Sequence, residues 1–151
     1  MMKINGILKK LPYTEPFLFV DSLLKITENS AEGVYTFKDN LSFYQGHFKN
    51  LPVTPGVILT ECCAQIGMVC LGIYLLTKEG EIDTEGFQIG MSSAEMEYLL
   101  PVYPNEKVRV VSEKIYFRFS KLKCKVVMYN DRDQIVCKGT IAGMLKLKSD
   151  A

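Results

Sequence analysis

The longest apolar stretch of the chain runs from Val57 to Leu76, and Glu61 is its only charged residue. Thr54 fits a helix N-cap before this stretch, Pro55 fits the first helical position, and Gly80 fits the far end. The pattern predicts a helix of about 23 residues and about 34 Å in length. Because its apolar residues lie all round, the helix is expected to be buried on every side.

The other long runs are rich in branched and aromatic residues, which is typical of strands. Phe17 to Thr27 and Ala31 to Phe37 predict a hairpin around a polar turn at residues 28–30. Phe87 to Tyr98 alternates less regularly and is expected to add one strand. A final antiparallel meander is predicted from three runs, Val108 to Phe119, Leu122 to Tyr129 and Ile135 to Leu147.

The predicted elements follow one another as a short helix, two strands, one long helix and four strands. This order predicts an α+β domain in which a strongly curved antiparallel sheet wraps the long helix. A chain of 151 residues suits a single domain, here residues 1–151. No repeat, linker or low-complexity segment indicates a second one.

Composition narrows the possible partners and the compartment. The chain has 18 basic and 17 acidic residues, so no overall field draws it to nucleic acid or anionic lipid. Its five cysteines lack paired CxxC spacing, which favours buried, reduced thiols in a cytoplasmic protein. The first residues contain no apolar core of signal-peptide length, so an export signal is not expected.

A membrane span is the alternative interpretation of the apolar stretch, because its length approaches that needed to cross a bilayer. Glu61 and Gln65 are polar residues inside it, and Gly67 and Gly72 lower its hydrophobicity. A buried core helix is therefore favoured over a membrane helix.

Candidate chemistry starts with His47, the only histidine of the chain, which lies fourteen residues before Glu61. Taken alone, each side chain is more typical of a hydrogen-bonded structural residue. Gly56 adds a third group, because free N–H groups at a helix start favour an anion. A base, an acid and an oxyanion donor together suit proton abstraction beside a thioester carbonyl, followed by loss of a β-hydroxyl.

Three segments carry a resemblance to a known family. They are GHFKNLPVTPGVILTECCAQ at residues 46–65, LPYTEPFLFVD at residues 11–21 and PVYPNEKV at residues 101–108. The first closely resembles the active-site signature of the 3-hydroxyacyl-acyl carrier protein dehydratases of fatty acid synthesis. The resemblance implies the hot-dog fold and conversion of a (3R)-3-hydroxyacyl thioester on acyl carrier protein to the trans-2-enoyl thioester and water.

The resemblance also implies roles for individual residues. His47 would remove the α-proton, Glu61 would protonate or position the departing hydroxyl, and the Gly56 N–H would hold the charge on the thioester oxygen. The Val53 carbonyl would orient the imidazole, and Gln65 would support the carboxylate. The family draws its two catalytic residues from different subunits, which implies a homodimer, often assembled as a trimer of dimers. No metal or organic cofactor is implied.

Several positions depart from the family pattern. Tyr13 replaces a histidine, and the other departures are Lys49 and Asn50 after GHF, Cys62 and Cys63 in the helix, and Leu99 and Leu100 before PVYP. They leave open the acyl chain, the carrier and the pathway, whether bulk fatty acid synthesis or a specialised lipid, polyene or pigment route. Small residues that permit close packing are a simpler interpretation of the two cysteines than nucleophiles.

Two rival functions stay open, as do the acyl chain length and the role of one lysine-rich strand face. A hot-dog thioesterase would use Glu61 to activate water or attack the thioester, and a binding module would hold the acyl thioester without turnover. Chain length would depend on the residues that close the end of an acyl tunnel, such as Met68, Met91, Met96 and Tyr98. Lys121, Lys123 and Lys125 share one strand face, which is either solvated surface or a docking site for an acidic carrier protein.

Overall fold

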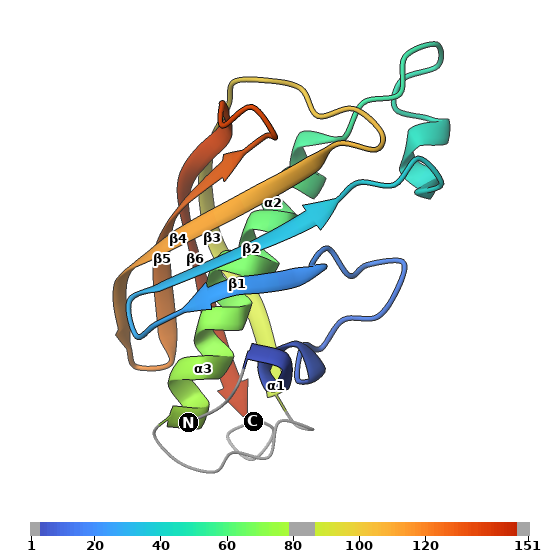
Figure 1. Ribbon diagram of the computed structural model, residues 1–151. Coiled ribbons are helices and arrows are strands. Elements are labelled where there is room, and N and C mark those ends of the chain that lie inside the picture. The colour runs from blue at the N-terminus through green and yellow to red at the C-terminus, as the bar shows by residue number, and fades with distance from the viewer. Residues whose placement is uncertain (1–3, 79–86, 148–151) are drawn as a thin grey trace.

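The long helix lies inside a curved sheet (Figure 1). In a computed structural model, which describes residues 4–78 and 87–147, six strands form one antiparallel sheet in the order β1-β2-β4-β5-β6-β3. The strands are β1 Ser22–Ile26, β2 Ser30–Thr36, β3 Phe87–Tyr98, β4 Lys107–Arg118, β5 Lys121–Tyr129 and β6 Ile135–Leu147. The helices are α1 Ile4–Lys9, the 3-10 helix η1 Ser42–Gln45, α2 Gly56–Ala64, the π-helical turn η2 Gln65–Val69 and α3 Cys70–Lys78. The predicted α+β hot-dog architecture is confirmed.

Within the described residues the predicted central helix spans Gly56–Lys78, 23 residues, and passes through α2, η2 and α3. Its length and composition would allow a membrane span, but 78% of its most apolar window is buried inside the molecule, so it is the core helix. The sheet packs closely against it. A Cβ on Gly67 would lie 2.9 Å from the Ser112 Cβ and 3.0 Å from Val126, which only glycine permits.

The start of the helix differs from the prediction. Pro55, and not Thr54, is the N-cap residue, and no side chain caps the helix. The Thr54 hydroxyl is hydrogen-bonded instead to the Tyr44 hydroxyl at 2.6 Å. Gly80, the predicted end, lies outside the described residues.

The prediction of a strand from Phe17 was wrong, because β1 begins only at Ser22. Residues 11–21, here called the N-terminal strap, cross the open side of the sheet without regular structure. The Phe19 N–H and the Phe17 carbonyl bond to the Gln65 side chain, so their polar groups are satisfied without a neighbouring strand.

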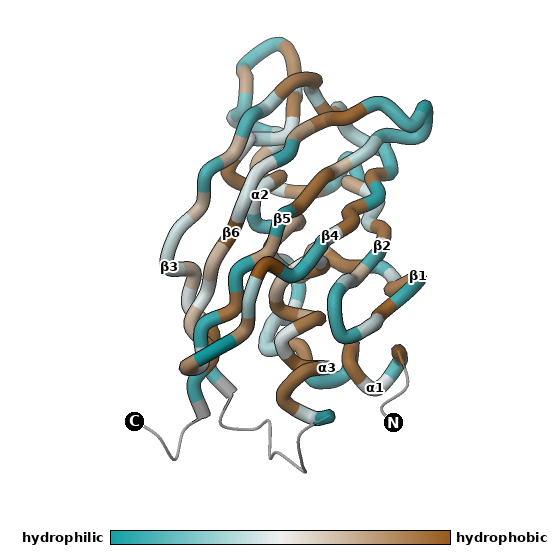
Figure 2. Tube along the Cα trace, turned by 90° about the vertical axis from the view of Figure 1, so that its left-hand side faces the viewer, coloured by the Kyte–Doolittle hydropathy of each residue, from teal (hydrophilic) through white to brown (hydrophobic). Residues whose placement is uncertain are grey.

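β3 forms the free edge of the sheet beyond β6, as Figure 2 shows on its left-hand side. It pairs with β6 over Phe87 to Tyr98, and its other side has no strand among the described residues. Because Tyr98, the last residue of β3, lies beside Gly56 at the helix start, β3 runs along the helix from the α3 side toward α2. The free edge therefore follows the helix over much of its length.

Candidate active site

His47 lies in a loop that closes on itself before the central helix. The Val53 N–H donates to the His47 carbonyl at 2.8 Å, and the His47 imidazole Nδ1 lies 2.9 Å from the Val53 carbonyl oxygen. A carbonyl oxygen can only accept a hydrogen bond, so Nδ1 carries the hydrogen. In the neutral ring the lone pair then resides on Nε2, which is the nitrogen able to take a proton.

Glu61 is held in the second turn of the helix by its neighbour one turn on. Gln65 Nε2 donates to Glu61 Oε2 at 2.9 Å. Burial raises the pKa of Glu61 above its usual value, and the hydrogen bond from Gln65 offsets part of that rise. The carboxyl group therefore keeps its proton to a higher pH than an exposed glutamate does.

Gln65 is fully buried, and its side chain joins the central helix to the N-terminal strap. Besides Glu61, its Nε2 donates to the Phe17 carbonyl at 3.1 Å, and its Oε1 accepts from the Phe19 N–H at 2.8 Å. It is also the first residue of the π-helical turn, a feature that the sequence pattern did not predict and that often occurs at functional sites. The amide thus fixes the N-terminal strap relative to the carboxylate.

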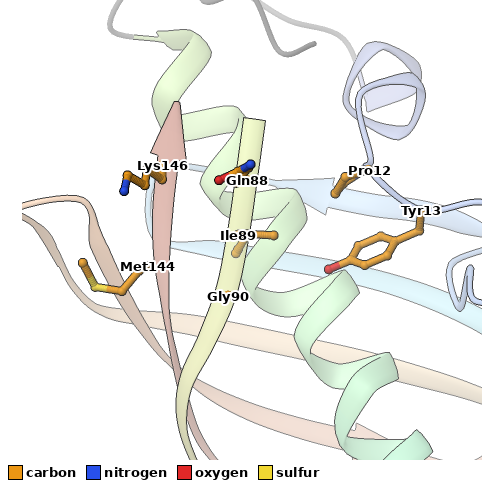
Figure 3. A pocket seen from close by; sticks show the side chains of 7 residues that line it. All are labelled: Pro12, Tyr13, Gln88, Ile89, Gly90, Met144 and Lys146. Atoms are coloured by element: carbon orange, nitrogen blue, oxygen red, sulfur yellow. The ribbon is translucent and has the colours of Figure 1, made fainter. Parts of the chain in front are cut away.

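Tyr13 is a further residue at the site, which the sequence marked only as a departure from the family pattern. Burial raises the pKa of its phenol, and the negative charge of nearby Glu61 raises it further. In Figure 3 the ring extends from the strap toward the central helix. The phenol is therefore held neutral and extends toward the helix that carries Glu61.

Gly56 opens onto a cavity of about 310 Å³ at the helix start. The cavity is lined by Thr54, Gly56, Leu59, Tyr98, Leu99, Leu100 and Pro101. A Cβ on Gly56 would lie 3.2 Å from the Tyr98 ring, whose hydroxyl is hydrogen-bonded to the Thr60 hydroxyl. Within the described residues no group accepts a hydrogen bond from the Gly56 N–H, which can therefore bind an anionic oxygen.

The structure brings Gly56, Glu61 and Gln65 together on one helix and places His47 beside Val53. Among the described residues of this single chain, no hydrogen bond or ion pair joins His47 to Glu61. The imidazole is thus fixed by the loop that contains Val53, and the carboxyl group is fixed separately by Gln65 on the helix.

The helix cysteines are unsuited to nucleophilic chemistry. Burial raises the pKa of Cys62 well above its usual value, and its thiol donates to the Phe19 carbonyl at 3.4 Å. The pKa of Cys63 is likewise raised, first by its contact with Cys137, whose sulfur lies 3.9 Å away, and then by burial. Nucleophilic attack needs a thiolate, so both residues serve as small packing groups.

The wrapped helix makes this chain a hot-dog domain, and the groups around its first turns are of the kind that transfer protons. The chain belongs to the FabA-like domain family, which matches residues 11–143.

Curated relatives match over nearly the whole chain. The 3-hydroxyacyl-[acyl-carrier-protein] dehydratase FabZ of Caldicellulosiruptor bescii is 32% identical over 147 residues, 97% of this chain and 100% of the relative. The FabZ of Clostridium perfringens is 36% identical over 141 residues, 93% of this chain and 96% of the relative.

Solved structures share the fold at low sequence identity. The dehydratase heterocomplex ApeI:P from Xenorhabdus doucetiae aligns with a TM-score of 0.78 at 9% identity, over 95% of this chain and 93% of the other. A thioesterase from Haemophilus influenzae aligns with a TM-score of 0.69 at 11% identity, over 98% of this chain and 93% of the other. Both dehydratases and thioesterases are thus built on this scaffold.

Proposed function

We propose that this protein is a 3-hydroxyacyl-[acyl-carrier-protein] dehydratase that forms a trans-2-enoyl thioester and water from a (3R)-3-hydroxyacyl thioester. The observation that carries the proposal is the state of two side chains. The His47 imidazole has its lone pair on Nε2, and the Glu61 carboxyl group has a raised pKa. Elimination needs one base and one acid in these protonation states. The FabZ relatives at 31–36% identity support the same reaction.

In the proposed mechanism His47 Nε2 removes a proton from C2 of the acyl chain. The charge that develops on the thioester oxygen is held by the Gly56 N–H and the positive end of the helix dipole. Glu61 donates its proton to the 3-hydroxyl group as the C3–O bond breaks, and the electrons of the C2–H bond form the C2=C3 double bond. Water leaves, and proton exchange restores neutral His47 and protonated Glu61.

We place the His47 and Glu61 of one reaction centre on the two subunits of a homodimer. The free edge of β3 supports this, since a two-fold axis can pair it with its copy as antiparallel strands. Apolar side chains around the His47 loop are also exposed, among them Phe48, Leu51 and Val57, the last with 74% of its surface accessible. A partner subunit would cover them.

We further propose that the carrier protein docks on the outer face of the sheet near the β4–β5 turn. Cross-strand register sets Lys121 beside Arg118 and Lys123 beside Tyr116, and Lys146 lies farther along the same end of β6. None of the cross-strand neighbours of Lys121, Lys123 and Lys146 is acidic, whereas Lys125 is paired with Glu113. An acidic partner is therefore favoured at this end.

Two features connect this surface with catalysis. Phe119 projects from the β4–β5 turn with 92% of its surface exposed, which gives the basic surface an apolar contact at its centre. In a two-fold dimer the beginning of β3 in one subunit lies beside Tyr98 in the other. The docking surface of each subunit would then border the cavity at Gly56 of its partner.

The direct test expresses the protein in the cytoplasm, purifies it and measures the absorbance change that accompanies enoyl formation. The substrates are 3-hydroxyacyl chains of C4 to C16 on acyl carrier protein, and the His47→Ala variant is the control. We expect turnover by the wild type and a loss of about 10² to 10⁴ in the variant. The absence of an absorbance change on every substrate would refute the proposal. Release of free thiol would indicate a thioesterase, and tight binding without turnover would indicate a binding module.

A further inference from the structure

The path of a bound acyl chain can be followed along the central helix. In the proposed mechanism the thioester carbonyl lies at Gly56 and the 3-hydroxyl at Glu61, so the chain points from the helix start toward α3. Beyond Glu61 in this direction lie the N-terminal strap and the beginning of β3. The strap contributes Tyr13 at that point, close enough for the charge of Glu61 to act on its phenol.

A hollow of about 570 Å³ borders the Tyr13 ring. Its lining is largely apolar and is formed by Pro12, Tyr13, Gln88, Ile89, Gly90, Met144 and Lys146. Figure 3 shows Tyr13 and Ile89 reaching toward the central helix from the strap and from β3. The Tyr13 ring therefore forms part of the wall of a hollow that suits an acyl tail, and it extends toward the helix that carries Glu61.

The Tyr13 ring is held in place. Its centroid lies 6.3 Å from that of Phe17, and Phe17 packs edge-to-face on Phe19 at 5.0 Å. Gln65 binds the backbone of both phenylalanines. The strap that carries Tyr13 is therefore tied to the central helix by the same Gln65 side chain that positions Glu61.

We propose that the bulk of Tyr13 limits the length of the acyl chain, so that this protein is a dehydratase of short 3-hydroxyacyl thioesters. The inference rests on the proposed function. A smaller residue at this position would open the hollow to longer chains. Each methylene then buried would raise kcat/KM by about fourfold, the equivalent of ~0.8 kcal/mol per buried CH₂.

The test compares kcat/KM for C4, C6, C8 and C10 substrates in wild type, Tyr13→Ala, Tyr13→His and Tyr13→Phe. We expect the C8 to C4 ratio to rise at least tenfold in the alanine and histidine variants. Tyr13→Phe keeps the size of the ring and should keep the wild-type ratio, whatever its absolute rate. A higher kcat/KM on long chains cannot arise from misfolding. If the alanine variant does not fold, the histidine variant provides the same test.

Three results would overturn the inference. One is a wild type that already prefers C10 over C4, and another is an unchanged ratio in both the alanine and histidine variants. The third is a shift in Tyr13→Phe as large as in Tyr13→Ala, which would assign the effect to the hydroxyl group. A wild type inactive on every chain would remove the proposed function and this inference with it, whereas an active wild type with unchanged variants removes the inference alone.

Discussion

Replacing Gln65 with leucine should loosen the strap and displace Glu61 at the same time. Leucine has a similar size but no polar atoms, so Gln65→Leu leaves the Phe19 N–H without its acceptor. Phe19 is 1% exposed, and an unsatisfied buried N–H costs about 1–3 kcal/mol. Phe17 is 46% exposed, so water can replace the donor lost at its carbonyl. We expect the free energy of unfolding to fall by about 2 kcal/mol.

The same variant should change the pH dependence of turnover. The Gln65 hydrogen bond lowers the pKa of Glu61, so its loss raises that pKa further. Glu61 must be protonated to act as the acid, and the rate therefore falls as pH rises through its pKa. In Gln65→Leu this alkaline limb should move to higher pH, while misplacement of the carboxyl group lowers kcat roughly 10- to 100-fold.

Urea unfolding and the pH profile of kcat measure the two effects separately. Gln45→Leu is the matched control, because Gln45 is exposed and its replacement should change the free energy of unfolding by less than about 0.5 kcal/mol. The reasoning would be refuted if Gln65→Leu unfolded like the control and kept the alkaline limb of the wild type.

Three further predictions follow from the dimer, the raised pKa and the basic surface. Mixing inactive His47→Ala and Glu61→Gln proteins should restore about a quarter of the wild-type activity, because half of the dimers are mixed and each carries one intact centre. No recovery after exchange of subunits would show that each centre lies within one chain. Glu61 has a raised pKa in the folded protein, so its contribution to stability is present below the unfolded pKa and is lost as pH rises through the folded pKa. The stability of Glu61→Gln relative to wild type should thus increase from pH 4 upward, and a constant difference in unfolding free energy would contradict this. Lys121→Glu with Lys123→Glu should raise KM for the carrier substrate and weaken its salt dependence, whereas Lys107→Glu, on an exposed residue at the other end of β4, should leave both unchanged. Equal KM values at low salt would refute the docking surface.

Most of the fold could be predicted from the sequence because its signals are long and regular. The start of the central helix and both ends of β3, β4, β5 and β6 were placed within one residue by their apolar runs. The start of β1 was not, because Phe17 and Phe19 have the pattern of a strand while their backbone groups bond to Gln65, 46 or more residues away. Such a bond between distant segments leaves no local signal.

In the candidate site, too, contacts between residues near in sequence could be predicted, and contacts between distant segments could not. The contacts of His47 with Val53 and of Glu61 with Gln65 lie within one loop and one helical turn, so the resemblance of this one continuous segment to the family motif was enough to pair these residues. Tyr13 is 48 residues from Glu61 and meets it only because the strap folds across the helix. Gly67 in the π-helical turn likewise contacts Ser112 and Val126, strand residues far away in the sequence, and residue spacing does not encode such contacts.

The close contact at Gly67 limits the parts of this protein in which substrate specificity can change. Helix and sheet meet there without room for a single added carbon, so a substrate cannot be accommodated between them at this point. The strap and the free edge of β3 border the remaining side of the helix. Changes of specificity in proteins built this way should therefore accumulate in the strap and along that edge, while the buried face of the helix stays constant.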